Sequence, residues 1–289
     1  MVKKALVVSA LVAAAVVAVG VYEVSGSAGA APGCTVRSTD ATPEAGPGDV
    51  VCFAGDLARQ RLVITDGGTA DKPVVYDGDG TAVGGITIQA DHVVVQHFTA
   101  DRPEAPGVDL EGTGITLRET TITRPVGGDG DGIRFFGDDL KILGNVVRDT
   151  DNANGHADCM QTFADDTPPS RHVLIEGNRC ERVDNMCLMA EGPNDGEGDG
   201  HGVTEDFTIR GNFCETREAS QALMFEDVRN ATITGNEFAA PTHHAIGLAI
   251  GSTGAHVSGN TLHPGIGYEV GIDDSSLPGY QGPEPGGEP

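Results

Sequence analysis

Two short runs of the chain hold side chains that can exchange protons and bind charged groups. One run contains His156, Asp158 and Gln161, and the other contains Asp131 and Arg134. Imidazole and carboxylate groups can act as general bases or acids, and a guanidinium can pair with a carboxylate of a ligand. If the fold brings the two runs together, the five side chains can bind an acidic ligand and move a proton. The alternative is that Asp158 and Gln161 only brace a turn.

An acidic segment further along the chain is the best candidate for a metal site. It carries Asp195, Glu197 and Asp199 at alternate positions, a glycine at the sixth position and Asp206 at the twelfth. This spacing approaches the calcium-loop pattern, in which alternate oxygens surround the ion. Glu at position three and Asp at position twelve depart from that pattern. We therefore expect either a Ca²⁺ site or a solvated acidic loop.

A repeated phrase shows how these side chains are positioned. A short β-branched strand, Gly-Asn and a second short strand recur five times, with the asparagines at positions 145, 178, 212, 236 and 260. Two of the steps between them are 24 residues, and the longer steps, 33 (145 to 178) and 34 (178 to 212), contain insertions at Ala164–Ser170 and Glu191–Glu205. Repeats of this length indicate a solenoid. We predict an all-β parallel β-helix of about eight rungs, with a short N-terminal cap.

Aligning the rungs predicts which side chains are neighbours. Strand alternation points every second residue inward, and the column two residues after each asparagine is apolar throughout: Val147, Cys180, Cys214, Phe238 and Leu262. On the first strand of each rung, Gln161 aligns with Arg134, and Asp158 aligns with Asp131. These four side chains should gather on one face across two adjacent rungs, with His156 at the rim.

The same alignment predicts how the six cysteines pair. Cys34 and Cys52 are the only cysteines of the N-terminal part. Cys180 aligns with Cys214, and Cys159 with Cys187, on adjacent rungs whose spacing of about 4.8 Å lies within the Cα range of a disulfide. We therefore predict three bonds, Cys34–Cys52, Cys159–Cys187 and Cys180–Cys214, with buried free thiols as the alternative.

The two ends of the chain differ in composition from the repeats. Residues 1–30 begin with two lysines and continue as an apolar run to a small-residue site, which predicts a cleaved signal peptide or an uncleaved N-terminal anchor. Residues 31–272 should form the β-helix domain, and the Pro/Gly/Glu-rich residues 273–289 a disordered tail. The protein should be secreted or held at the cell surface. The net charge of -25 argues against nucleic acid and against an anionic membrane as partners.

The repeated rung, with its clearest copy at Ile233–Phe238, resembles the right-handed parallel β-helix proteins of the pectate-lyase-like superfamily. The segments Pro47–Val51 and Lys72–Tyr76 are similar to the N-terminal part of secreted β-helix polysaccharide lyases, and the resemblance covers roughly residues 46–270. It implies a polysaccharide substrate lying along the first-strand face. Superfamily members also include hydrolases, epimerases and non-catalytic surface proteins.

We therefore expect a polysaccharide lyase acting on an acidic polysaccharide, and we expect the protein to be a monomer. His156 or Arg134 would be the base, and Arg134 or a bound metal ion would neutralise the sugar carboxylate. Lys72 and Lys141, the lysines outside the N-terminal segment, do not fall on the first-strand face, which argues against a lysine base. The alternatives are a glycoside hydrolase using Asp131 and Asp158, an epimerase, a non-catalytic carbohydrate- or surface-binding β-helix, and a structural envelope protein.

Overall fold

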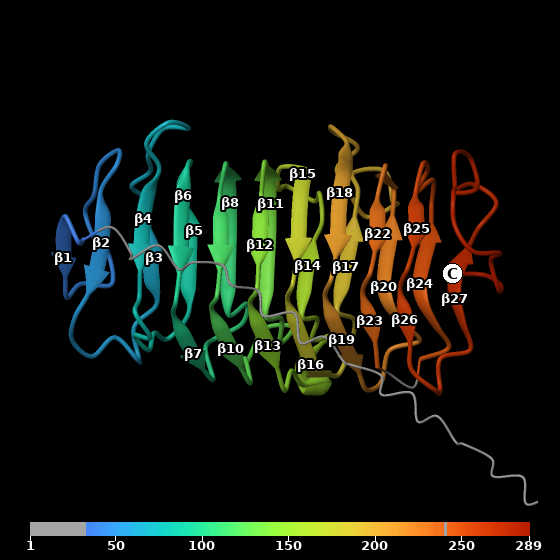
Figure 1. Ribbon diagram of the computed structural model, residues 1–289, viewed down its shortest axis with the longest axis horizontal. Helices are drawn as coiled ribbons and strands as arrows, with labels where there is room; N and C mark the ends of the chain where they lie inside the picture. The colour runs from blue at the N-terminus through green and yellow to red at the C-terminus, as the bar shows by residue number, and fades with distance from the viewer. Residues whose placement is uncertain (1–32, 240–241) are drawn as a thin grey trace, which may run out of the picture. The chain divides into compact units, whose positions relative to one another are not determined.

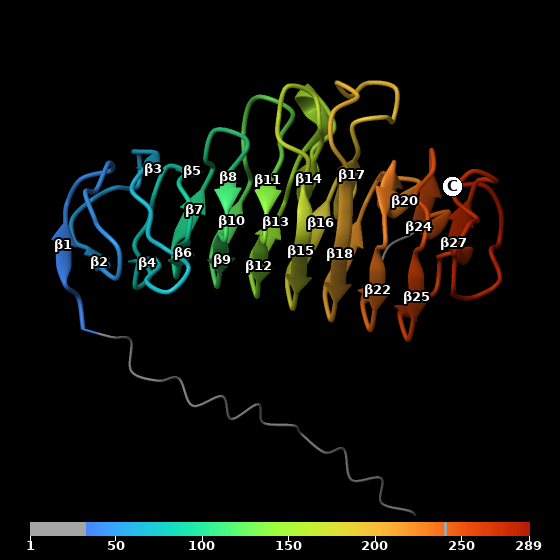
Figure 2. The ribbon, with the colours of Figure 1, turned by 90° about the horizontal axis from the view of Figure 1, so that it is seen from above.

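The computed structural model describes residues 33–289 with the exception of 240–241. Residues 33–289 form one compact unit built from successive coils of short strands (Figures 1 and 2). The expected signal peptide, residues 1–30, lies outside the described residues. In the described part of the chain no helix is long and apolar enough to cross a membrane.

The strands stack in three parallel columns, and each of the middle coils contributes at least one strand to every column. The first column contains β3 (Leu62–Ile64), β5 (Ile86–Gln89), β8 (Val108–Thr113), β11 (Ile133–Asp138), β14 (Met160–Thr162), β17 (Leu188–Glu191), β20 (Gln221–Glu226), β24 (His244–Ala249) and β27 (Tyr268–Ile272). The second contains β1 (Val36–Ser38), β2 (Val50–Phe53), β4 (Val74–Asp77), β6 (Val93–Gln96), β9 (Thr116–Arg118), β12 (Lys141–Leu143), β15 (Arg171–Glu176), β18 (Thr204–Arg210), β21 (Val228–Arg229), β22 (Thr232–Thr234) and β25 (His256–Ser258). The third contains β7 (Thr99–Asp101), β10 (Thr121–Thr123), β13 (Val146–Arg148), β16 (Arg179–Val183), β19 (Phe213–Thr216), β23 (Glu237–Phe238) and β26 (Thr261–Leu262). The predicted all-β parallel β-helix is therefore confirmed.

The predicted register is confirmed on two faces of the coils. In the third column, Val147 pairs with Cys180 and Cys180 with Cys214, and all three side chains are buried. In the first column, Arg134 pairs with Gln161, as the alignment requires. Inward-pointing aliphatic side chains fill the space between the columns, so each coil buries its apolar face only against its neighbours and its own interior.

The corner between the second and third columns combines two residue types with separate roles. The glycine before each repeated asparagine takes the left-handed conformation, as at Gly144 (φ 61°) and Gly211 (φ 63°). The asparagine itself does not take this conformation. Its amide instead forms a ladder: in the middle of the stack, the backbone N–H and side-chain amide of Asn178 donate to Oδ1 of Asn212 at 2.8 and 3.0 Å.

Two of the three predicted disulfides are wrong, and the difference has a geometric reason. The bonds are Cys34–Cys52, as predicted, and Cys159–Cys180 and Cys187–Cys214. In-register side chains on adjacent parallel strands point the same way, so their Cβ atoms stay about 4.8 Å apart, beyond the usual 3.5–4.5 Å of a disulfide. Side chains that face each other across the coil interior can approach more closely. Each of the two bonds therefore closes one coil, joining its first strand to its third.

The C-terminal tail is ordered in the structure, contrary to the prediction from its composition. The backbone N–H of Gly286 donates to the carbonyl of Val270, and that of Ile272 donates to the carbonyl of Gly287. Further back, Gln281 forms a parallel bridge with His256, and Ser276 is buried. The tail lacks apolar residues for a core of its own, but it satisfies the open backbone groups at the last coil's edge.

Candidate functional site

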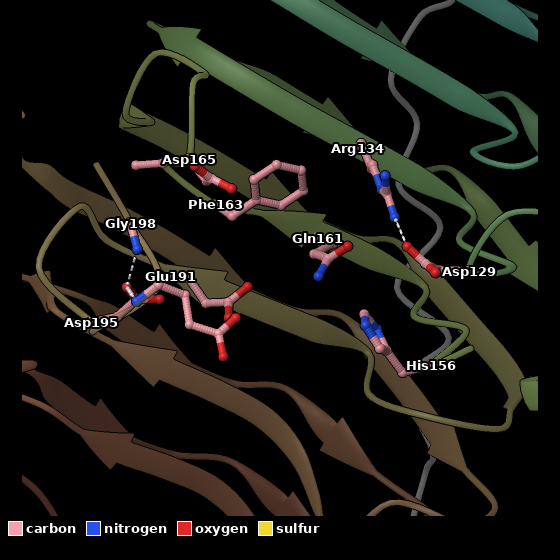
Figure 3. A pocket seen from close by; sticks show the side chains of 11 residues that line it. Asp129, Arg134, His156, Gln161, Phe163, Asp165, Glu191, Asp195 and Gly198 are labelled. Carbon is pink, nitrogen blue, oxygen red and sulfur yellow. Dashed lines mark hydrogen bonds and ion pairs between the residues drawn. The ribbon is translucent and has the colours of Figure 1, made fainter. Parts of the chain in front are cut away.

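Loops at both ends of the first-column strands enclose an open cavity of about 210 Å³ (Figure 3). The loops that precede β11 and β14 supply one wall, and the two insertions that follow β14 and β17 supply the other. The lining side chains that matter for chemistry are Asp129, Arg134, His156, Gln161, Phe163, Asp165, Glu191, Asp195 and Glu197. The predicted cluster of Asp131, Arg134, His156, Asp158 and Gln161 thus lies in and directly beneath one wall of a real cavity.

Arg134 is fixed as a cation by two carboxylates. Its Nε donates to Oδ2 of Asp131 at 2.7 Å, its Nη2 donates to Oδ2 of Asp129 at 2.7 Å, and its guanidinium carbon lies 5.5 Å from the centre of the Phe163 ring. Burial opposes the charge, but the two carboxylates outweigh it and raise the pKa of Arg134. Arg134 is therefore unsuited to act as a base. Burial also raises the pKa of Asp131, although the positive charge of Arg134 reduces the size of this rise.

His156 and Asp158 form a dyad in which the imidazole is exposed to solvent and the carboxylate is buried. Asp158 is fully buried, and its Oδ1 accepts hydrogen bonds from the backbone N–H of Met186 (2.7 Å) and from Nδ2 of Asn185 (2.9 Å). Its Oδ2 has no hydrogen-bond partner and lies 3.8 Å from Nδ1 of His156, whose side chain is 58% exposed. Burial raises the pKa of Asp158 to about 6, and the Asp158 carboxylate raises the pKa of His156 to about 9. The proton of the pair therefore resides on the imidazole at neutral pH.

Gln161 supplies an unused polar atom to the cavity. Its side chain is buried, its Oε1 has no hydrogen-bond partner, and Figure 3 shows it between Arg134 and Glu191. A buried polar atom without a partner is costly unless a ligand or water satisfies it. Gln161 is therefore placed to hydrogen-bond a ligand in the centre of the cavity.

Three carboxylates meet at the opposite wall. Oxygen atoms of Glu191, Asp195 and Glu226 lie within 4.8 Å of one another. Burial and the neighbouring charge of Asp195 raise the pKa of Glu191 to about 7, and the same two causes raise the pKa of Glu226. Oxygen ligands of this kind suit a hard cation such as Ca²⁺, which would remove their mutual repulsion.

The acidic segment predicted as a calcium loop does not converge on one point. Asp195 and Asp199 accept hydrogen bonds from the segment's own backbone, at Gly198 and His201 respectively. Asp206 instead accepts from Nδ2 of Asn230 on the neighbouring coil. Of the four predicted ligands, Asp195 joins the three-carboxylate cluster and Glu197 lines the cavity.

A second group of potential metal ligands consists of Asp131, His156 and Asp158. One ligand atom from each of these side chains lies within 4.8 Å of the other two. Arg134 lies 2.6 Å from Oδ2 of Asp131 and already supplies positive charge there. The three-carboxylate cluster, which has no cationic partner among the contacts of the described residues, is therefore the better place for a metal ion.

Five important residues were missed by sequence reasoning: Asp129, Phe163, Asp165, Glu191 and Glu226. The last two could have been found, because Glu191 pairs with Glu226 in register at the ends of β17 and β20. Phe163 lies two residues after Gln161, and its ring packs edge-on against Phe136, with 4.9 Å between ring centres. Asp129 and Asp165 lie in loops whose path the rung alignment does not define.

Comparison with known proteins supports the architecture. No family model and no curated protein sequence matches the chain. Among solved structures, a double mutant of the tailspike protein of E. coli bacteriophage HK620 in complex with a pentasaccharide is similar, with a TM-score of 0.52 and 13% identity. The chain has the parallel β-helix fold. The alignment covers 81% of this chain and 45% of the tailspike chain, so this chain spans less than half of that structure.

Two further similar structures are enzymes by their names. The PL6 family alginate lyase AlyGC aligns with 79% of this chain and 38% of its own, at a TM-score of 0.47 and 12% identity. The catalytic unit of the GH87 alpha-1,3-glucanase from Streptomyces thermodiastaticus aligns with 82% of this chain and 49% of its own, at a TM-score of 0.43 and 17% identity. At these identities the likeness is one of fold.

Proposed function

We propose that the protein is an exported enzyme that binds a polysaccharide along its first-strand face and cleaves it by β-elimination. The observation that carries the proposal is the dyad in the cavity wall: a buried Asp158 oxygen without a hydrogen-bond partner lies 3.8 Å from the exposed imidazole of His156. The tailspike structure, a β-helix in complex with a pentasaccharide, gives a precedent for a saccharide on this fold. Three disulfides are consistent with export.

His156 is the base in this proposal. A proton next to a sugar carboxylate is weakly acidic, and the Asp158 carboxylate makes the imidazole a stronger base than an isolated histidine. His156 accepts that proton, the electron pair left behind forms a carbon–carbon double bond, and the bond to the glycosidic oxygen breaks. The departing oxygen takes a proton from solvent, so the product carries an unsaturated sugar at its new end.

The charge of the cavity decides what else the reaction needs. Asp129, Asp165, Glu191, Asp195 and Glu197 line it, and the one arginine there is already paired with two carboxylates. An acidic sugar would be repelled unless its carboxylate were neutralised. A Ca²⁺ ion held by Glu191, Asp195 and Glu226 would supply that neutralisation. Gln161 then hydrogen-bonds the bound sugar, and the ring of Phe163 gives it an apolar surface.

A second candidate function is glycoside hydrolysis of a neutral polysaccharide. The pKa of Glu191, raised to about 7, is the observation that favours it, because a carboxyl protonated near neutral pH can donate a proton to a leaving glycosidic oxygen. Asp195 or Asp165 would then be the second carboxylate. This reaction needs no cation, and a cation at the cluster would remove the proton that Glu191 must donate.

One experiment separates the two reactions. Acidic and neutral polysaccharides are incubated with the protein at pH 6 to 9.5, with Ca²⁺ or with a chelator, and ultraviolet absorbance and new reducing ends are followed together. Elimination gives both signals, needs Ca²⁺ and increases toward pH 9. Hydrolysis gives reducing ends without absorbance, declines above pH 7 and is inhibited by Ca²⁺. Saturable binding without either product would leave a non-catalytic carbohydrate-binding β-helix.

A further inference from the structure

A second groove lies at the corner between the first and second columns. It consists of two hollows of about 340 and about 290 Å³, and Glu111 and Gly112 line both of them, so the two are continuous. This corner groove has no lining residue in common with the cavity. The first insertion contributes to both, with Asp165 lining the cavity and Pro168 lining the corner groove. The corner groove is therefore a site of its own.

The floor of the corner groove is built from residues with little or no side chain. Gly112 of β8 pairs in register with Gly137 of β11, and Ala90 follows β5 at the equivalent position. A Cβ atom on Gly137 would clash with the carbonyl of Gly112, so the coils stack here without side chains between them. The strands β5, β8 and β11 lie on successive coils (Figure 1). The floor therefore runs along the stack for about 10 Å, at 4.8 Å per step.

Polar side chains line the corner groove at the strand ends. The side chains of Glu111 and Thr113 are exposed and make no hydrogen bond to other described residues. Oδ1 of Asp138 lies 2.6 Å from Nδ1 of His172, and its Oδ2 accepts a hydrogen bond from Nη2 of Arg171 at 2.7 Å. The hydrogen bond with His172 is the main cause that lowers the pKa of Asp138. The corner groove therefore offers acceptors for hydroxyl groups, one of them fixed in place.

The end of the corner groove at the two insertions is apolar. Pro168 and Pro169 of the first insertion and Val203 of the second line it. The insertions pack against each other at this point, because a Cβ atom on Gly202 would lie only 2.7 Å from Cγ of Pro169. Apolar surface beside a few placed polar groups is typical of sites that bind small ligands.

The charges of the lining side chains favour an uncharged ligand. Asp91, Glu111 and Asp138 outnumber Arg171, which is already paired with Asp138, so an anionic ligand would be repelled. These three carboxylates are not among the groups of described residues whose ligand atoms come within 4.8 Å of one another, which argues against a metal ion. Sugar hydroxyl groups suit the lining, because each can donate to a carboxylate and accept from the Thr113 hydroxyl or a guanidinium N–H.

We propose that the corner groove is a second carbohydrate site, which binds a short stretch of a neutral polysaccharide and holds the protein on it. Hydroxyl groups of the bound sugar donate to Glu111 and Asp138, while its C–H groups pack on Pro168 and Val203. The inference goes beyond the proposed function, because this site binds without reacting and does not involve His156 or Ca²⁺.

A single thiol placed in the corner groove tests the proposal. All six native cysteines are in disulfides, so Thr113→Cys introduces the one thiol that a bulky maleimide can modify. Thr113 is exposed, and the variant keeps the backbone N–H that donates to Oδ1 of Asp91. Glu284→Cys, an exposed position in the C-terminal tail, is the matched control. Glu111→Ala is a second variant that removes one acceptor without a label.

Retention of each protein is measured by affinity electrophoresis in gels that contain a mixed-linkage β-glucan, a galactomannan or dextran. We expect at least one of these neutral polymers to retain the unlabelled proteins. Labelling at position 113 should weaken that retention several-fold, labelling at position 284 should leave it unchanged, and Glu111→Ala should weaken it by a smaller factor. Short oligosaccharides of the same polymer should slow the labelling reaction at position 113 and not at position 284.

Two results would overturn the second site: no retention by any of the three neutral polymers, or retention that the label at position 113 leaves unchanged. Cleavage is assayed separately on the same proteins, so either result leaves the proposed reaction in the cavity standing. Conversely, loss of retention on labelling in a protein that cleaves no polysaccharide would support the second site while the proposed function fails.

Discussion

Oδ2 of Asp158 lies 3.8 Å from Nδ1 of His156 and is buried without any hydrogen-bond partner in the described part of the chain. The other Asp158 oxygen is held by two donors, so the carboxylate cannot turn away from the imidazole. A small movement of the exposed His156 ring would complete a charge-assisted hydrogen bond. The dyad therefore couples the protonation of a solvent-exposed group to a fixed buried charge.

Asp158→Asn should lower the pKa of His156 from about 9 toward 6.5, its ordinary value, because the variant removes the charge that stabilises the imidazolium. The pH at which activity is half-maximal should decrease by a similar amount. The maximal rate should fall because the imidazole of the variant is a weaker base. Titration of the His156 ring protons by NMR measures the first effect. An unchanged titration curve would show that the dyad does not form in solution.

His156→Asn should reduce cleavage at pH 9 by roughly 100-fold or more, the usual contribution of a general base. The circular dichroism spectrum and melting temperature should change little, since the side chain is mostly exposed. His172→Asn is the control, because His172 is an equally exposed histidine that pairs with Asp138 outside the cavity. Comparable rates for the two variants would remove His156 from the mechanism.

Glu191→Gln should stabilise the metal-free protein at pH 8 and leave it nearly unchanged at pH 4.5. The folded-state pKa of Glu191 is raised from its ordinary 4.5 to about 7. The contribution of Glu191 to the free energy of unfolding is therefore fully present below pH 4.5 and is lost as pH rises through 7. The gain at pH 8 has an upper bound of ~3 kcal/mol. Urea unfolding at the two pH values measures it. Equal effects of Glu191→Gln at the two pH values would contradict this account.

Adding Ca²⁺ should raise the melting temperature at pH 8 and have much less effect at pH 5, where Glu191 is protonated. At 100 times the dissociation constant the stabilisation is about 2.7 kcal/mol. Glu226→Gln should weaken Ca²⁺ binding measured by calorimetry, and Asp199→Asn should not. The opposite result, with Asp199→Asn alone weakening binding, would place the ion in the acidic loop.

Asn212→Ala should destabilise the protein by roughly 2–4 kcal/mol. The variant removes the Oδ1 atom that accepts from the backbone N–H of Asn178, and it frees the buried carbonyl of Ile175. Asn260→Ala should cost less, because Asn260 ends the ladder and is partly exposed, so water can replace its bonds. Urea unfolding of both variants measures the difference, and equal losses would contradict this account of the ladder.

The fold could be predicted from the sequence because the structural repeat of a solenoid appears as a repeat of the amino-acid sequence. The asparagine spacing sets the phase of each coil, and strand alternation then assigns Val147, Cys180 and Cys214 to one inward column, as the structure confirms. The pairing of Arg134 with Gln161 follows from the same reasoning. This much depends only on distances along the stack, which are fixed by the hydrogen bonding of parallel strands.

The contacts across the interior of a coil and the paths of its loops do not follow from the repeat of the sequence. The alignment shows that Cys159 is the neighbour of Cys187 along the stack, but not that it faces Cys180 across the interior. Likewise, the acidic insertion has no rung partner to define its path, so its meeting with Glu191 and Glu226 could not be predicted. Composition also failed for the tail, whose order comes from backbone bonds to the last coil.

The two disulfides that close single coils have a consequence for how the protein comes apart. A stack of coils opens from its ends, because each coil is held only by its neighbours. Cys159–Cys180 and Cys187–Cys214 lock the two coils that also carry Gln161 and Glu191. Fraying that begins at either terminus therefore meets a covalent stop at these two coils, while the coil that carries Arg134 lies outside them. Under oxidising conditions these two coils should be the last part of the stack to unfold, and a reductant would abolish that protection.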